Sequence, residues 1–279
     1  MVSACENQPR GDPRRAAAMI WARAFAFNFV FFAWTALIGT IALPVLLTTR
    51  QRTMRFGRFW ASSVLALLKA IVGLDHEIRG FNRIPRSGCI VAMKHQSTWD
   101  TLILPIVLDD PIIVLKRELL FVPFFGWYAA RAGSIAIDRK AGAGALRRML
   151  AKARRVAATG QPIVIFPEGT RVAPGEHRPY HPGVAALYQT QALPLVPAAV
   201  NSGLYWGRRS FTKRPGRIVL EFLDPIPPGW PRDRLMAELE QRIETATAAL
   251  LREGTSRSNT RAVPQRSFRD APEEQARNP

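Results

Sequence analysis

A histidine and an aspartate separated by four residues follow an apolar run in this sequence. His95 and Asp100 come directly after residues 89–93, a short apolar segment typical of a buried strand. Histidine transfers protons near neutral pH, and a nearby carboxylate fixes its tautomer and raises its basicity. Five residues advance a helix by about 500°, which would put the two side chains on different faces. The spacing therefore favours a strand, a turn that carries His95, and then a helix, an arrangement able to activate a hydroxyl group.

The same residues also fit a purely structural role. Ser97 followed three residues later by Asp100 is similar to a capping box at the start of a helix over residues 98–108. His95 would then be an ordinary loop residue. The two roles are compatible, because a helix that starts at Ser97 has Asp100 in its first turn, close to the residues that precede it. The stretch by itself leaves both roles open.

Two further groups of polar residues follow predicted strands. Lys116 comes after one apolar run, and Glu168-Gly169-Thr170-Arg171 comes after another. Glycine allows the backbone to approach a ligand closely, whereas a hydroxyl and a guanidinium suit phosphate oxygens. In an open α/β sheet, the loops after the carboxyl ends of the strands gather at one edge. We therefore expect His95, Lys116 and Arg171 to converge.

The pattern of the chain from residue 75 onward predicts the elements that position these residues. Short apolar runs alternate with helical periodicity, which indicates an α/β sheet. Besides the helix after Ser97, amphipathic patterns predict helices over residues 141–159 and 232–252. The predicted strands cover residues 76–79, 89–93, 112–115, 134–137, 163–166, 195–200 and 217–222.

The N-terminal part of the chain is apolar and flanked by arginines. Residues 1–18 read as a disordered basic tail, and residues 24–49 form a 26-residue run without a formal charge, long enough to cross a bilayer. A shorter apolar stretch follows at 59–74. Arginines at both ends of the first run favour a membrane-associated helical pair over 19–74, embedded in one leaflet, over a single span. A soluble chain with buried N-terminal helices remains the alternative.

The charge of the chain predicts anionic partners. The formal net charge of the 279 residues is +18, but the basic residues form no nucleic-acid motif, so we expect anionic membrane lipids or phosphates and no nucleic acid. Residues 254–279 are polar without apolar periodicity, which predicts a disordered tail. The histidines and cysteines lack metal-ligand spacing, so no metal is expected.

The residues described above resemble conserved blocks of the glycerolipid acyltransferase family, in particular the 1-acylglycerol-3-phosphate acyltransferases. The resemblance covers residues 75–225 and rests on His95 and Asp100, on the block 166–171 about 70 residues later, and on the order of the residues between and after them. The latter are Lys116, Glu118, Pro123, Gly126, Gly133, Ile137-Asp138-Arg139 and Val196-Pro197. One departure lies in Tyr180-His181-Pro182-Gly183, which keeps the glycine but lacks the lysine, where the family often carries a basic residue before a glycine.

This resemblance implies a mixed sheet flanked by helices, with an acyltransferase domain at 75–253 after the membrane-associated helical pair. It implies that His95, oriented by Asp100, acts as general base on the acceptor hydroxyl, which attacks a thioester directly. Lys116 and Arg171 would hold the acceptor phosphate, with Glu168, Gly169 and Thr170 shaping the acceptor pocket. Backbone amides at the start of the Ser97 helix are the natural donors to the oxyanion.

The expected reaction moves a fatty acyl group to the sn-2 hydroxyl of lysophosphatidic acid and gives phosphatidic acid. Acyl-CoA or acyl carrier protein would be the donor, with no cofactor, at the inner (cytoplasmic) membrane with the catalytic domain facing the cytoplasm. A same-family enzyme for another acceptor, such as a headgroup lysophospholipid or lyso-ornithine lipid, remains possible. So does a non-catalytic membrane protein that binds anionic lipids. The donor, the chain length and the oligomeric state stay open.

Overall fold

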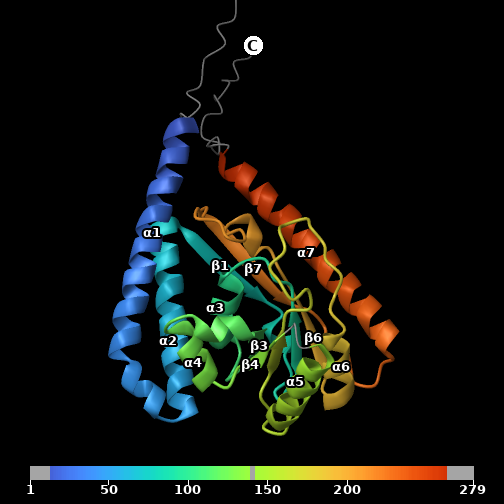
Figure 1. Cartoon of the computed structure of the whole chain (residues 1–279). Helices are drawn as coiled ribbons and strands as arrows, with labels where there is room; N and C mark the ends of the chain where they lie inside the picture. Colours follow the sequence, from blue (N-terminus) through green and yellow to red (C-terminus); the bar gives the residue numbers. More distant parts are fainter. Residues whose placement is uncertain (1–12, 139–141, 263–279) are drawn as a thin grey trace, which may run out of the picture.

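Short runs of apolar residues, rich in isoleucine and valine, form a seven-stranded mixed sheet with helices on both faces (Figure 1). The computed structural model describes residues 13–138 and 142–262. The strands are β1 (Leu74–Arg79), β2 (Ile90–Met93), β3 (Ile112–Lys116), β4 (Ile135–Ile137), β5 (Ile163–Ile165), β6 (Leu195–Val200) and β7 (Gly216–Phe222). Each predicted strand is present, with bounds that differ by at most two residues.

The helices lie between these strands and before them. The longer ones are α1 (Pro13–Ile41), α2 (Arg50–Leu67), α3 (Trp99–Val107), α4 (Phe125–Arg131), α5 (Gly142–Ala157), α6 (Gly183–Gln191) and α7 (Arg232–Ala262). Single turns of other helix types are η1 (Leu43–Leu47), η2 (Leu68–Val72), η3 (Phe81–Arg83), η4 (Arg117–Phe121) and η6 (Ser202–Leu204). Residue 141, the predicted start of α5, lies outside the described residues.

The strand order is β1-β7-β6-β2-β5-β3-β4. β2 pairs in parallel with both β5 and β6, β5 pairs in parallel with β3, and β3 with β4. Only the β6–β7 pair is antiparallel among these seven strands, and β1 lies parallel to β7. The carboxyl ends of β2 to β6 therefore lie along one edge of the sheet, where ligands of open α/β folds bind.

The two faces of the sheet are covered by different helices. Along β2, Val91 and Met93 belong to a core shared with α2 and α3, whereas Ile90 and Ala92 belong to a core shared with α5, α6 and α7. This alternation follows from the two-residue period of a strand. Because both faces are buried, the central strands are continuously apolar, which is why the sequence revealed them so clearly.

The N-terminal segment forms a pair of helices, α1 and α2, that stand side by side (Figure 1). The indole of Trp34 donates to Ser63 Oγ at 2.8 Å, and that of Trp60 donates to Thr35 Oγ1 at 3.2 Å. Among the described residues one helix, Arg14–Ile41, is long and apolar enough to cross a membrane. Four of its aromatic side chains, Trp21, Phe25, Phe29 and Phe32, are exposed, Phe29 by 68%, whereas Phe27 is fully buried.

Helix α1 begins at Pro13, inside the segment for which the sequence predicts a disordered tail over 1–18. Three consecutive alanines beside two arginines are strong helix formers, and proline is well tolerated in a first helical turn. Residues 1–12 lie outside the described part of the chain. The boundary of the predicted tail is therefore too late by several residues.

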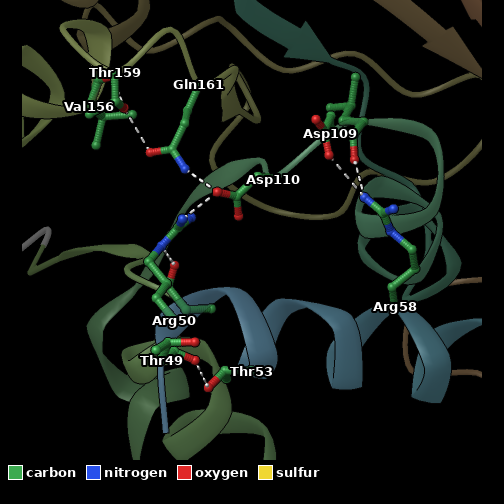
Figure 2. A network of polar contacts seen from close by, with 11 residues as sticks. Thr49, Arg50, Thr53, Arg58, Asp109, Asp110, Val156, Thr159 and Gln161 are labelled. Carbon is green, nitrogen blue, oxygen red and sulfur yellow. Dashed lines mark hydrogen bonds and ion pairs between the residues drawn. The ribbon is translucent and has the colours of Figure 1, made fainter.

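Arginines of α2 attach the helical pair to the sheet domain (Figure 2). Arg50 donates to the carboxylate of Asp110 and, through Nε, to the carbonyl of Ala132 at 2.7 Å. Gln161 donates to the same carboxylate oxygen of Asp110. About two turns further along α2, Arg58 pairs with Asp109 at 3.4 Å. Arg50 and Arg58, which the sequence analysis places among the arginines that flank the membrane-associated segment, thus hold α2 against the turn before β3.

The last helix continues past its predicted end. The sequence predicts a helix over 232–252 and a disordered tail over 254–279, whereas α7 runs to Ala262. The missing side chain of Gly254 lets the helix approach Leu204 and Tyr205 closely, since a Cβ there would lie 2.7 Å from Leu204 Cδ1. Asn201 also donates to the carbonyl of Leu250 at 3.2 Å. Residues 263–279 of the predicted tail lie outside the described residues.

Candidate active site

Three loops that follow strands bring the predicted chemical groups to one edge of the sheet. His95 follows β2, Lys116 ends β3, and the segment with Arg171 follows β5. All three line one cavity of about 830 Å³. The expected convergence of these residues is confirmed, and it results from the parallel direction of β2, β3 and β5.

His95 and Asp100 form a hydrogen-bonded pair. The His95 Nδ1 lies 2.9 Å from Asp100 Oδ2, and the imidazole faces the cavity. An ionised carboxylate only accepts hydrogen bonds, so Nδ1 carries the proton of a neutral imidazole and Nε2 keeps a free lone pair. The pair therefore presents a base of fixed tautomer to whatever enters the cavity.

The carboxylate of Asp100 is held from four sides. It accepts hydrogen bonds from the amides of Gln96 at 2.7 Å and Ser97 at 2.8 Å, in addition to the His95 contact. Its other oxygen accepts from Ser202 Oγ at 2.5 Å. The side chain is fully buried. Asp100 thus orients His95 and at the same time satisfies backbone donors at the beginning of α3.

The predicted capping box is only half formed. Asp100 accepts the amide of Ser97, as the box requires, but Ser97 Oγ accepts from the amide of Trp99 at 3.2 Å rather than from that of Asp100. Helix α3 begins one residue later than the box implies, with Thr98 at its N-cap. The predicted bond of the Asp100 side chain is confirmed. The predicted bond of the Ser97 hydroxyl is wrong, because the helix begins one residue later and Ser97 lies before its N-cap.

The imidazole of His95 is also fixed by its neighbours. Its ring stacks on Phe166, at the carboxyl end of β5, with 4.0 Å between ring centroids. The carbonyl of His95 accepts from the amide of Val172 at 2.8 Å. These contacts connect the loop after β2 to the loop after β5, so that the ring position depends on both.

A buried ion cluster lies behind His95. Lys94 is 1% exposed, and its Nζ donates to Glu168 Oε1 at 2.6 Å and to the two carboxylate oxygens of Glu244 on α7 at 2.8 and 2.9 Å. Burial raises the pKa of Glu168, and Lys94 opposes this rise. Tyr180 donates to Glu244 at 2.8 Å. The cluster ties both active-site loops to α7.

The structure corrects the predicted role of Glu168 in the acceptor pocket. Its carboxylate is buried, engaged by Lys94, and within 3.4 Å of the His95 amide, whereas the cavity wall is formed by Gly169, Thr170 and Arg171. Gly169 has a φ of +67°, which L side chains rarely adopt, and its amide donates to the carbonyl of Phe166 at 2.9 Å. This tight turn directs Glu168 inward and its successors toward the cavity.

The two predicted phosphate-binding residues lie on the same cavity in different surroundings. Arg171 Nη1 donates to Thr98 Oγ1 at 2.8 Å. Burial lowers the pKa of Arg171, and the positive charges of Arg208 and Arg209 lower it further. Lys116 is half-exposed and its Nζ lies 3.0 Å from Glu118. Their function in binding an acceptor remains a prediction.

Four residues of the site were missed by sequence reasoning. Phe166 is the last residue of the predicted strand 163–166 and appears only as the first residue of the block 166–171. Ser202 follows the predicted strand 195–200, a position that marks it as a candidate in an open sheet. Arg208 and Arg209 line the cavity but sit in a loop of a chain with 39 basic residues. Nothing local distinguishes them from the other arginines.

The expected oxyanion donors are largely engaged elsewhere. The amides of Gln96 and Ser97 donate to Asp100, and that of Trp99 donates to Ser97. The prediction that amides at the start of this helix receive the oxyanion is therefore wrong for these three, because they stabilise the Asp100 carboxylate. Within residues 13–138 and 142–262, no three histidine, cysteine or acidic side chains gather as a metal site would require.

The cavity extends from His95 into an apolar region between the helical pair and the sheet. Polar residues line it near His95, and apolar residues line its remainder. The apolar walls come from α1, α2, β3, α4 and α5, and include Gly39, Met54, Phe56, Trp60, Ile113, Leu115, Phe124, Tyr128, Leu146 and Met149. The size and lining suit a ligand with one polar end and a long apolar chain.

Comparisons with known proteins agree with this site. A family model described as Acyltransferase matches residues 75–201. The chain is 37% identical over 213 residues to a 1-acyl-sn-glycerol-3-phosphate acyltransferase of Pseudomonas aeruginosa, covering 76% of this chain and 82% of the relative. It is 30% identical over 209 residues to the human 1-acyl-sn-glycerol-3-phosphate acyltransferase alpha, covering 73% and 72%.

A solved structure shares the fold. The crystal structure of the 1-acyl-sn-glycerophosphate (LPA) acyltransferase from Thermotoga maritima superposes with a TM-score of 0.68 at 19% identity, covering 83% of this chain and 97% of that one. This likeness concerns the fold, a mixed sheet with helices on both faces. The chain belongs to the acyltransferase family whose relatives are named 1-acyl-sn-glycerol-3-phosphate acyltransferases. It is an enzyme, as the sequence predicts.

Proposed function

We propose that this enzyme transfers a fatty acyl group from a thioester to the free sn-2 hydroxyl of 1-acylglycerol-3-phosphate, which gives phosphatidic acid. The observation that carries the proposal is the His95–Asp100 pair, with a proton-accepting Nε2 directed to an amphipathic cavity that also holds Arg171. The names of the relatives support the same acceptor.

The reaction needs one base and no covalent enzyme intermediate. Nε2 of His95 takes the proton of the acceptor hydroxyl as its oxygen attacks the thioester carbonyl, and Asp100 stabilises the imidazolium that forms. The new carbon–oxygen bond gives a tetrahedral oxyanion. Its collapse breaks the carbon–sulfur bond, and the thiolate leaves with the proton that His95 returns. The donor is acyl-CoA or acyl carrier protein.

The polar and the apolar parts of the cavity suit the phosphate and the acyl chain of the reactants. Lys116 and Arg171 hold the acceptor phosphate in this proposal, which is supported by their position on the cavity together with Gly169 and Thr170. The apolar region beside Trp60, part of a cavity of about 830 Å³, receives the acyl chain. Binding of the chain there excludes water from the thioester and so limits its hydrolysis.

The helical pair gives the enzyme access to a bilayer. Exposed aromatic residues of α1 and Phe121 of η4, which is 73% exposed, lie outside the folded core. We propose that α1 and α2 associate with the inner membrane, with the sheet domain on its cytoplasmic side and the basic chain attracted to anionic lipids. This places the cavity beside both the lysolipid and the soluble thioester.

An acceptor panel tests the proposal. The purified enzyme is assayed with acyl-CoA and with acyl carrier protein, each against 1-acylglycerol-3-phosphate, headgroup lysophospholipids and lyso-ornithine lipid. The proposal predicts the highest kcat/KM for 1-acylglycerol-3-phosphate. Preference for an acceptor without the phosphate monoester would contradict it. Liposome binding without thioester consumption, with every acceptor, would support the non-catalytic alternative instead.

A further inference from the structure

A tight turn between β6 and β7 carries two adjacent arginines to the active-site cavity. The turn runs from Gly207 to Ser210, closed by a hydrogen bond from the Ser210 amide to the Gly207 carbonyl at 3.1 Å. Arg209 adopts a φ of +56°, an uncommon backbone conformation for a residue other than glycine. Both arginines line the same cavity as His95 and Arg171.

The guanidinium groups of Arg171, Arg208 and Arg209 are close enough to repel one another, and fewer carboxylates than guanidinium groups lie near them. Arg208 and Arg209 each repel the positive charge of Arg171, while Asp100 attracts it. Within the described ranges, neither Arg208 nor Arg209 forms an ion pair with a carboxylate. Asp100 offsets part of this positive charge, but four donors already occupy its carboxylate oxygens. The cavity therefore carries more positive than negative charge close to the base.

The turn is held in place on its C-terminal side by the membrane-associated helix. Lys213 is 2% exposed, and its Nζ donates to Asn28 Oδ1 of α1 at 2.5 Å. The same ammonium lies over the rings of Phe27 and Trp206, 5.4 and 4.9 Å from their centroids. Figure 1 shows this orange segment, between β6 and β7, reaching toward the upper half of α1.

The N-terminal side of the turn is fixed by the other active-site loops. The amide of Gly203 donates to Gln96 Oε1 at 3.0 Å, and a Cβ at Gly203 would lie 2.8 Å from Pro174 Cγ. The loops after β2, β5 and β6 thus interlock at this point. These contacts anchor the backbone of the turn on both sides, so binding a ligand need not order the backbone and costs mainly the side-chain freedom of the two exposed arginines.

We propose that Arg208 and Arg209 complete, with Arg171, a clamp that selects the phosphate monoester of the acceptor over phosphodiester and uncharged headgroups. The inference rests on the proposed function and assigns its acceptor preference to named residues. A phosphate monoester carries a charge of about −1.5 to −2 at pH 7 and three strong acceptor oxygens, so it can accept from three guanidinium groups at once. A phosphodiester carries one charge and two free oxygens, and satisfies such a clamp less completely.

The test compares an Arg208→Gln/Arg209→Gln variant with a matched control, Arg147→Gln/Arg148→Gln. The control removes two adjacent, exposed arginines of α5 that do not line the cavity. Both variants therefore lose the same positive charge, and any general loss of attraction to anionic lipids affects them equally. Kinetics in mixed micelles use 1-oleoylglycerol 3-phosphate and 1-oleoylglycerol 3-phosphoglycerol as acceptors. In the test variant we expect the KM for the monoester to rise about tenfold or more, from the loss of two charge-assisted contacts. The KM of the acyl donor should stay unchanged.

A binding measurement in a His95→Ala background separates this inference from the proposed function. There the arginine variant should bind 1-oleoylglycerol 3-phosphate about tenfold more weakly or worse, with a much smaller change for the phosphodiester. The clamp would be overturned if the arginine variant lost equal affinity for both lysolipids, or if the control variant lost as much affinity as the arginine variant. It would also be overturned if the KM of the acyl donor rose instead of that of the acceptor. If the wild-type enzyme transfers no acyl group to any acceptor, the proposed function fails, while the binding result still decides the clamp.

Discussion

Replacing Lys94 by methionine should destabilise the enzyme strongly, because it leaves two carboxylates without their shared cation. The side chain of Glu168 is fully buried, and Lys94 is its ion-pair partner at 2.6 Å. Removing one member of a buried ion pair typically costs about 3–5 kcal/mol. Methionine preserves the length of the side chain, so a cavity contributes little to the loss.

The size of this effect should depend on pH. Burial raises the pKa of Glu168, and Lys94 is the main opposing influence, so the variant should have a still higher Glu168 pKa. A carboxyl group whose pKa is higher in the folded state stabilises that state below its unfolded pKa, and loses this contribution as pH rises through the folded pKa. The Lys94→Met variant should therefore be about 3 kcal/mol less stable than wild type at pH 8 and closer to wild type at pH 5.

Thermal unfolding in detergent at the two pH values measures this difference. At roughly 2–4 °C per kcal/mol for a chain of this size, the melting temperature at pH 8 should fall by about 6–12 °C. A Lys94→Met/Glu168→Gln double variant removes the stranded charge and should recover part of the loss. If Lys94→Met melts within about 1 °C of wild type at pH 8, or if Glu168→Gln gives no recovery, the buried cluster does not support the active-site loops as described.

Two further substitutions probe how the loop after β6 is held. Burial lowers the pKa of Lys213 to about 8 from 10.5. Between these pH values the unfolded state binds more protons than the folded state. The free energy of unfolding should therefore rise with pH in this range, by up to about 1.4 kcal/mol per pH unit. Denaturant unfolding should show this rise in wild type and not in Lys213→Met; equal slopes would contradict the buried cation. Gly203→Ala should lower kcat about tenfold by moving Ser202 away from Asp100. Gly207→Ala should leave kcat unchanged, because a Cβ there would meet no atom closer than 3.7 Å. Equal kcat values for the two variants would show that the close packing at Gly203 is unimportant.

Much of the fold could be predicted because its signals are local. The central strands are apolar on both faces, so each appears as a short apolar run wherever the sheet passes. The same holds for His95 and Asp100, whose spacing already implies a turn between a strand and a helix. Once the strands are placed, the rule that ligands bind at their carboxyl ends brings Lys116 and Arg171 to the same cavity without further information.

The parts that sequence reasoning missed depend on contacts between distant residues. Lys94 pairs with Glu168, 74 positions away, and with Glu244, 150 positions away, and neither separation leaves a local pattern. The continuation of α7 depends on the fit of Gly254 against η6, although glycine normally marks a helix end. Arg208 and Arg209 become distinctive only when the turn that carries them is placed at the cavity.

The central claim is that Nε2 of His95, oriented by Asp100, removes the proton from an acceptor hydroxyl. Single-turnover acyl transfer from a labelled acyl thioester to 1-acylglycerol-3-phosphate measures that step directly in wild type, His95→Ala and Asp100→Asn. We expect the rate of His95→Ala to fall at least about 100-fold, with an unchanged melting temperature, because the lost group is a general base. Asp100→Asn should also fall in rate, since its amide no longer fixes the tautomer. Full activity of a folded His95→Ala variant would contradict the account.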